Sequence, residues 1–166
     1  MTDSSSIIQL LEACGPGPLS EVVVTAPTLL ANDSHSLSPG AQQLRPSRSG
    51  APVLSCERWL RVRFTPPVGL VGNLRLWVPG IALPTGWHLR FGTSADYSPP
   101  SSSRSVYALA DMPATDPGVS NLGGDVTIDD TGMHYTPWIV VQASLTGTDV
   151  DVSEQTLSVH FGWTES

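Results

Sequence analysis

The sequence predicts an all-β protein: an antiparallel β-sandwich of the jelly-roll or immunoglobulin-like kind with an extended N-terminal arm. Gly and Pro number 15 each and only 14% of the 166 residues are charged, which suits short strands joined by turns. Three runs between residues 59 and 91 alternate apolar with basic or aromatic side chains, as strands of a half-buried sheet do. At this length, one domain with a two-layer core is expected.

Residues 1–52 are predicted to form the arm, a long loop and one strand. Ser4 to Ser6, an apolar stretch from Ile7 to Cys14 and two Gly-Pro pairs predict a short capped helix that needs a packing partner. Residues 21–25 are rich in β-branched side chains and predict the first strand. Residues 32–52 are rich in Ser, Pro, Gly, Gln and Arg, and this long loop is a candidate contact arm.

Residues 53–166 are predicted to form the sandwich body, with strands at 59–64, 74–78, 87–91, 105–109, 126–128, 138–145 and 156–163. A turn is expected at residues 71–73, and the run 138–145 has the continuous apolar character of a central strand. Alternation assigns a set of apolar side chains to the core. These are Leu60, Val62, Leu74, Leu76, Leu89, Phe91, Val140, Val159 and Phe161.

The opposite face of the runs between residues 59 and 91 carries arginine and tryptophan. Both residue types are enriched in docking surfaces, although a charged outer face is also an ordinary solvated one. The predicted partner-binding residues are Arg61, Arg63, Arg75, Trp77 and Arg90.

Charge is divided unevenly along the chain. Residues 1–104 hold eight Arg and six acidic residues, a balance of +2, and residues 105–166 hold no Arg and nine acidic residues, a balance of −9; the sum is the net charge of −7. A nucleic-acid partner is not expected, because phosphate neutralisation needs many cations on one surface. Unlike regions of identical copies are predicted to meet in a closed assembly, unless the acidic loops serve only solubility.

No catalytic site is predicted, and the chain is not expected to be an enzyme. It has no Gly-x-Ser-x-Gly elbow, phosphate-binding loop or His-Glu-x-x-His motif, and its four His are scattered. Cys14 and Cys56 are too few for a disulfide scaffold or a zinc site and are expected to be thiols.

No metal or cofactor is predicted either. Two acidic clusters are alternative calcium ligands, but neither follows the twelve-residue loop pattern. They are Asp125, Asp129 and Asp130, and Asp149, Asp151 and Glu154. Gln9 and Glu12 interrupt the one apolar stretch near the N-terminus, so neither a signal peptide nor a membrane span is expected there.

A set of short motifs extends over residues 55–163. They are 73–77 (Asn-Leu-Arg-Leu-Trp), 83–89 (Leu-Pro-Thr-Gly-Trp-His-Leu), Gly92-Thr93, Tyr97 with Pro99, Met112-Pro113, 116–118 (Asp-Pro-Gly), 121–123 (Asn-Leu-Gly) and 138–142 (Trp-Ile-Val-Val-Gln). Together they resemble small β-sandwich virion structural proteins of tailed bacteriophages, of the capsid decoration (cement) or neck-tail type. The segment before Val53 departs from that pattern.

The resemblance implies a capsid decoration protein that stabilises the shell, is made in the host cytoplasm and resides in the virion. Its implied partners are the major capsid protein or other virion proteins and further copies of itself, with a trimer favoured, and no cofactor, nucleic acid or membrane. One alternative is a neck or tail component. Another is a sugar-binding or host-surface-binding module, with Trp77 as the best candidate because flat aromatic faces stack on sugars.

Overall fold

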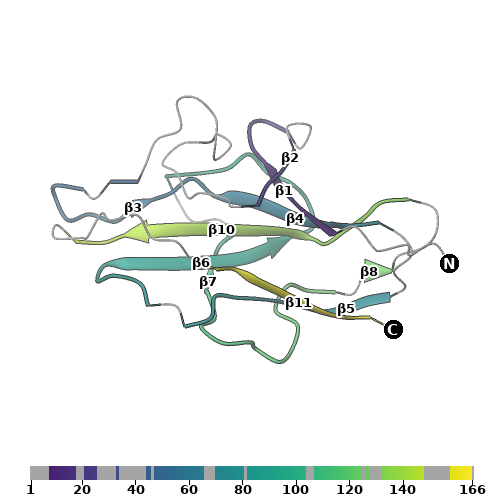
Figure 1. Cartoon of the computed structure of the whole chain (residues 1–166). Helices are drawn as coiled ribbons and strands as arrows, with labels where there is room; N and C mark the ends of the chain where they lie inside the picture. Colours follow the sequence, from purple (N-terminus) through teal and green to yellow (C-terminus); the bar gives the residue numbers. More distant parts are fainter. Residues whose placement is uncertain are drawn as a thin grey trace.

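The computed structural model describes residues 8–17, 21–25, 33, 44–45, 47–65, 70–80, 82–103, 107–124, 126–127, 132–147 and 158–165. These residues form two antiparallel sheets whose apolar faces pack on one another, and they contain no helix. In Figure 1 the long strands β10 and β6 run side by side, with β11 and β5 beneath them. The predicted all-β antiparallel sandwich is therefore confirmed.

The larger sheet has the strand order β2-β1-β4-β10-β6-β7, with β3 paired to β10 and β9 paired to β4. Its strands are β1 (Ile8–Ala13), β2 (Val22–Val23), β3 (Val53–Leu54), β4 (Arg58–Phe64), β6 (Trp87–Ser94), β7 (Ala110–Asp111), β9 (His134–Tyr135) and β10 (Trp138–Leu145). β10 lies between β4 and β6, as predicted for a central strand. Its side chains are apolar almost without interruption because both of its faces are covered.

The smaller sheet has the order β11-β5-β8, formed by β5 (Leu70–Trp77), β8 (Val126–Thr127) and β11 (His160–Glu165). The sequence suggested that the three runs between residues 59 and 91 share one sheet, and this was wrong. β4 and β6 flank β10 in the large sheet, and β5 faces them across the core. The turn predicted at residues 71–73 was also wrong. Those residues lie inside β5, where Asn73 adopts a φ of 51°, a left-handed conformation that Asn tolerates.

The predicted N-terminal helix was wrong. Ile8–Ala13 is strand β1, which pairs antiparallel with β4 from Ile8 opposite Phe64 to Ala13 opposite Trp59. A short isolated helix gains little from its few internal hydrogen bonds, whereas each residue of this strand gains a cross-strand neighbour. The described part of residues 1–52 thus contributes two strands to the large sheet instead of one.

Most of the predicted core is confirmed. Leu60, Val62, Leu74, Leu76, Leu89 and Phe91 are buried between the sheets, with Phe161 partly buried against them. Val140 is fully buried, but in a second apolar cluster on the outer face of the large sheet. Val159 was assigned wrongly: it is 50% exposed and precedes the first residue of β11.

One ion pair is enclosed within the large sheet. Arg58 Nη1 lies 3.2 Å from Glu12 Oε1, and both side chains are buried. Breaking such a pair leaves an uncompensated buried charge, which is strongly destabilising. Arg58 is therefore a structural arginine.

Candidate binding surface

The outer face of the large sheet is divided into a covered half and an open half. Over the covered half, Tyr97 and Tyr107 make edge-on contacts with Trp59, with ring centroids 5.1 and 4.8 Å away, and Trp59 is completely buried. The backbone of Tyr107 lies so close to β6 that a Cβ at Gly92 would collide with the Tyr107 carbonyl oxygen. Trp59 and its aromatic neighbours are therefore structural.

The open half is built by the register of four strands. Leu11 of β1 lies between Val23 of β2 and Arg61 of β4, and in the next row Arg63 lies between Gln9 of β1 and Tyr135 of β9. We call this surface the Arg61 face. It comprises Gln9, Glu21, Val23, Arg61, Arg63, Met133 and Tyr135, and the buried Trp138 lies at its border with the covered half.

Arg61 is held rigidly at the centre of this face. Its Nε and Nη2 donate to the two carboxylate oxygens of Glu21, at 2.5 and 2.6 Å. Its guanidinium carbon lies 3.9 Å from the ring centroid of Tyr135 and 4.5 Å from that of Trp138. A guanidinium held by a two-point ion pair and by aromatic rings keeps one orientation, so this group is preorganised.

Exposed apolar side chains flank the paired arginines. Arg63 donates to Oε1 of Gln9, and its Nη1 lies 3.5 Å from the sulfur of Met133. Met133 is nevertheless 58% exposed, and Val23 is 53% exposed. Aromatic residues, Met and Arg are enriched in protein interfaces, so this composition is typical of a docking surface.

The other predicted partner-binding residues lie elsewhere. Arg75 and Trp77 alternate with the buried Leu74, Leu76 and Val78, which places them on the outer face of the small sheet. Arg90 is on β6, where it pairs with Asp111 of the edge strand β7 at 3.4 Å. The expectation of a single arginine face was wrong for Arg75 and Trp77, because β5 belongs to the other sheet. Arg90 alternates with the buried Leu89 and Phe91, so it is on the outer face of the large sheet, but β10 separates it from Arg61.

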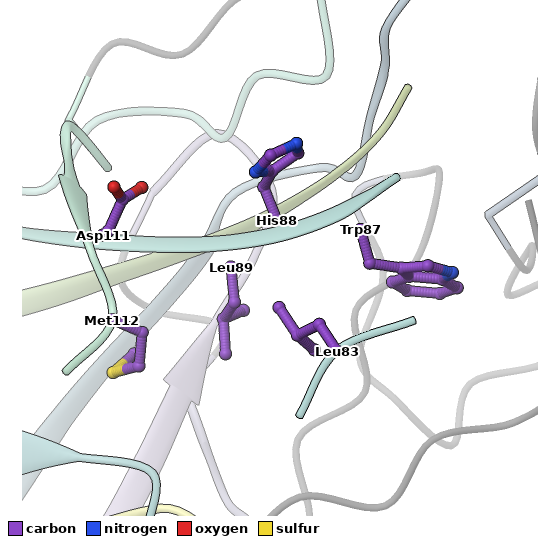
Figure 2. A pocket seen from close by; sticks show the side chains of 6 residues that line it. All are labelled: Leu83, Trp87, His88, Leu89, Asp111 and Met112. Atoms are coloured by element: carbon purple, nitrogen blue, oxygen red, sulfur yellow. The ribbon is translucent and has the colours of Figure 1, made fainter. Parts of the chain in front are cut away.

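A shallow pocket of about 180 Å³ lies beside β6 (Figure 2). Figure 2 shows His88 and Asp111 on one side of the β6 ribbon, and Leu89 and Met112 on the other side. The imidazole and the carboxylate therefore do not converge on the apolar lining. General acid–base catalysis needs such groups within hydrogen-bonding reach of one bound substrate, and this pocket does not provide that arrangement.

The Cys56 thiol is not an activated nucleophile. Cys14 and Cys56 are buried thiols, as predicted. Burial, followed by the negative charge of Asp33, raises the pKa of Cys56 from its ordinary 9.0 to about 11. Because the thiolate is the reactive form, Cys56 is unreactive at neutral pH.

Burial likewise raises the pKa of Tyr97, with Asp33 as the next cause. The Tyr97 hydroxyl donates to the carbonyl oxygen of Gly15 at 2.8 Å, and the backbone N–H of Gly15 donates to Asp33 at 2.8 Å. These bonds tie the segment after β1 to the covered half of the sheet. Tyr97 therefore has a structural part in this region.

Among the described residues, no three His, Cys, Asp or Glu side chains are grouped so that they could hold a metal ion. Both acidic clusters that the sequence offered as calcium ligands lie outside the described residues. The described part of the chain likewise has no helix long and apolar enough to cross a membrane.

Sequence reasoning identified Arg61 and Arg63 but missed the residues that complete their surface. Glu21 is 40 positions from Arg61, and Met133 is 70 positions from Arg63. Neither pairing has a local sequence signal, because each depends on strand order. Alternation within β1 could have placed Gln9 on an outer face, but only once Ile8–Ala13 was known to be a strand.

Comparison of the chain with protein-family models, with curated proteins and with solved structures found no match. Function is therefore inferred from the residues and the geometry of this chain.

Proposed function

We propose that this chain is a non-enzymatic structural protein of a tailed-bacteriophage virion, a capsid decoration protein that binds the shell through the Arg61 face. The sequence motifs of residues 55–163 support the class of protein. The observation that carries the proposal is the fixed guanidinium of Arg61, packed on the rings of Tyr135 and Trp138, on a face that also carries the exposed Val23 and Met133. Interface energy concentrates in rigid arginine and aromatic side chains of this kind.

The pairing of the arginines indicates how this surface would bind. Glu21 occupies the hydrogen-bonding edge of Arg61 and balances its charge, whereas Arg63 donates to the neutral amide of Gln9 and keeps its positive charge. The partner would meet the exposed Val23 and Met133 and the partly exposed ring of Tyr135. Added salt should therefore weaken binding only modestly, because Arg61 is already neutralised and Arg63 is the arginine of this face that keeps its charge.

The proposed partners are the major capsid protein and further copies of this chain, with a trimer favoured. A decoration protein occupies repeated positions over the whole shell, whereas the alternative neck or tail component would form one ring at a single vertex. An image of purified particles at moderate resolution distinguishes the two by symmetry. If the image showed one ring at a single vertex, the protein would still be a virion protein, but a neck or tail component instead of a decoration protein.

The docking surface is tested by adding purified protein to particles that lack it and measuring the bound fraction after sedimentation. Val23→Glu with Met133→Glu places two carboxylates on the Arg61 face without removing a buried group, and should weaken binding by about tenfold or more. Val119→Glu is the control, because Val119 is likewise apolar and exposed but lies in the segment that hydrogen-bonds to β5 of the other sheet.

The expected result is loss of binding in the double variant and wild-type binding in the control. Binding of the folded double variant at wild-type affinity would show that the Arg61 face is not the contact surface. Failure of the wild-type protein to bind the particles at all would remove the virion proposal itself.

A further inference from the structure

A second cluster of aromatic and charged side chains lies on the outer face of the small sheet, opposite to the Arg61 face. In the β11–β5 register, His160 is directly opposite Trp77 and Gly162 is directly opposite Arg75. The ring centroids of Trp77 and His160 are 5.4 Å apart, and the guanidinium carbon of Arg75 lies 5.9 Å from the Trp77 ring. We call Arg75, Trp77, Asp116, His160 and Gly162 the Trp77 site.

Gly162 allows the indole to rest against the backbone of β11. A Cβ at this position would lie 3.0 Å from Cζ3 and 3.1 Å from Cη2 of Trp77, and 3.2 Å from Nη2 of Arg75. These distances are shorter than ordinary van der Waals contacts, so any larger residue would displace the ring. Trp77 is still partly exposed, and His160 is exposed. The indole is therefore supported from below by the backbone and remains accessible.

Arg75 and Asp116 form the polar edge of the Trp77 site, and both are held by hydrogen bonds. Nη1 of Arg75 donates to both carboxylate oxygens of Asp116, at 2.9 and 2.7 Å, and Oδ1 of Asp116 also accepts from the backbone N–H of Gly118 at 2.9 Å. The loop that carries Asp116 is anchored by Asn121, whose side chain accepts from the N–H of Leu76 and donates to its carbonyl, both at 2.8 Å.

We propose that the Trp77 site binds a neutral sugar, whose apolar face would stack on the indole while its hydroxyl groups bond to the fixed polar edge. A flat aromatic face beside a few fixed polar groups is the usual composition of a small-ligand site. Charge complementarity selects the ligand: Asp116 already neutralises Arg75, so a phosphate or carboxylate ligand would meet an equal negative charge. Asp116 remains 43% exposed and Arg75 carries further N–H groups, which gives the hydroxyls both acceptors and donors.

The Trp77 site is independent of the proposed attachment to a shell. Arg75 and Trp77 alternate with core residues of the small sheet, whereas Arg61 and Arg63 alternate with core residues of the large sheet. Failure of one proposal therefore leaves the other standing.

The proposal is tested by following the tryptophan indole N–H signals in ¹H–¹⁵N spectra of the full chain. The probes are the methyl glycosides of glucose, galactose, mannose and N-acetylglucosamine, with glucuronic acid as the charged comparison. The expected result is a saturable shift of the Trp77 signal with at least one neutral glycoside. The Trp87 signal serves as the internal control, because Trp87 is also partly exposed but lies on β6 of the other sheet, and it should not move.

Three variants locate the contact. Trp77→Ala should lower the affinity for the responding glycoside by about tenfold or more, and Trp77→Phe, which keeps an aromatic face, should lower it less. Gly162→Ala keeps the tryptophan side chain but shifts its indole away from β11, and should therefore weaken binding.

No saturable shift with any neutral glycoside would overturn the proposal. So would a response to glucuronic acid alone, or shifts in the wild-type protein that map to another surface. The last measurement needs no variant, so it decides the matter even if Trp77→Ala fails to fold.

Discussion

Replacing Glu21 with Gln and Arg61 with Met, singly and together, should reveal a coupling free energy of about 1 to 2 kcal/mol between them. Arg61→Met removes the guanidinium but keeps an apolar stem, so the packing on the neighbouring rings is largely retained. In the double variant both charges are absent, so no charged group is left without its partner. The cycle therefore isolates the interaction from the cost of stranding one charge.

The magnitude follows from the burial and the geometry of the pair. Fully exposed ion pairs contribute about 0.2 to 1 kcal/mol, and hydrogen bonds to charged groups about 1.5 to 3 kcal/mol. Arg61 and Glu21 are 21% and 18% exposed and share two hydrogen bonds, so their coupling should fall between these ranges. Arg75 and Asp116 provide the comparison, because Asp116 is 43% exposed and this pair uses one guanidinium nitrogen.

Urea unfolding of the four proteins, followed by tryptophan fluorescence, gives the free energies if the slopes with denaturant agree. The same cycle with Arg75→Met and Asp116→Asn should give a smaller coupling, of about 1 kcal/mol or less. A Glu21–Arg61 coupling below about 0.3 kcal/mol, or one no larger than that of the comparison pair, would show that Arg61 is not preorganised by Glu21.

Three further predictions concern stability. Leu76→Ala should cost about 2 to 5 kcal/mol in urea unfolding, because Leu76 is buried between the sheets, and a loss below about 0.5 kcal/mol would contradict its core position. Gly92→Ala should cost about 1 to 3 kcal/mol because its Cβ meets the Tyr107 carbonyl, whereas Gly124→Ala, with open space around it, should change stability by less than about 0.5 kcal/mol. The raised pKa of Cys56 contributes stability that is present below pH 9.0 and is lost as the pH rises through about 11, so Cys56→Ala should flatten this alkaline decline in thermal unfolding.

Local sequence patterns correctly predicted which side chains of a strand face the core, because this depends only on neighbouring residues. Alternation assigned Leu60 and Val62 to the core and Arg61 and Arg63 to the opposite face, because side chains of a strand alternate regardless of its partners. Sheet membership could not be found in this way. β10 enters between β4 and β6 from more than forty residues downstream, and no feature of the runs themselves signals that insertion.

The helix prediction for the N-terminal segment was wrong for a related reason. Its serine run and its Gly-Pro pairs are valid boundary signals, but they mark the ends of an apolar segment without fixing its conformation. Ile8–Ala13 becomes a strand because β4 offers it a complete antiparallel partner. Pairing with a strand 46 to 56 positions downstream overrides the weak local preference for a helix.

The fold also changes what the division of charge means. Asp116 and Asp111, from the acidic part of the chain, pair with Arg75 and Arg90 of the basic part within the same molecule. Arg61 and Arg58 pair with Glu21 and Glu12, which are close to them in the sheet. The contrast in charge that predicts contact between copies is thus partly satisfied inside each copy, and apolar contacts become the more important term in any assembly.

The two proposed sites lie on opposite outer faces of the sandwich, so both can be occupied at the same time. The outer faces of its two sheets point in opposite directions, so a protein bound to a shell by the Arg61 face would direct the Trp77 site away from it. Sugar binding by particle-bound protein should then match that of the free protein. If attachment to particles abolished the glycoside response of Trp77, the shell would have to contact the small sheet, and the assignment of the two faces would be reversed.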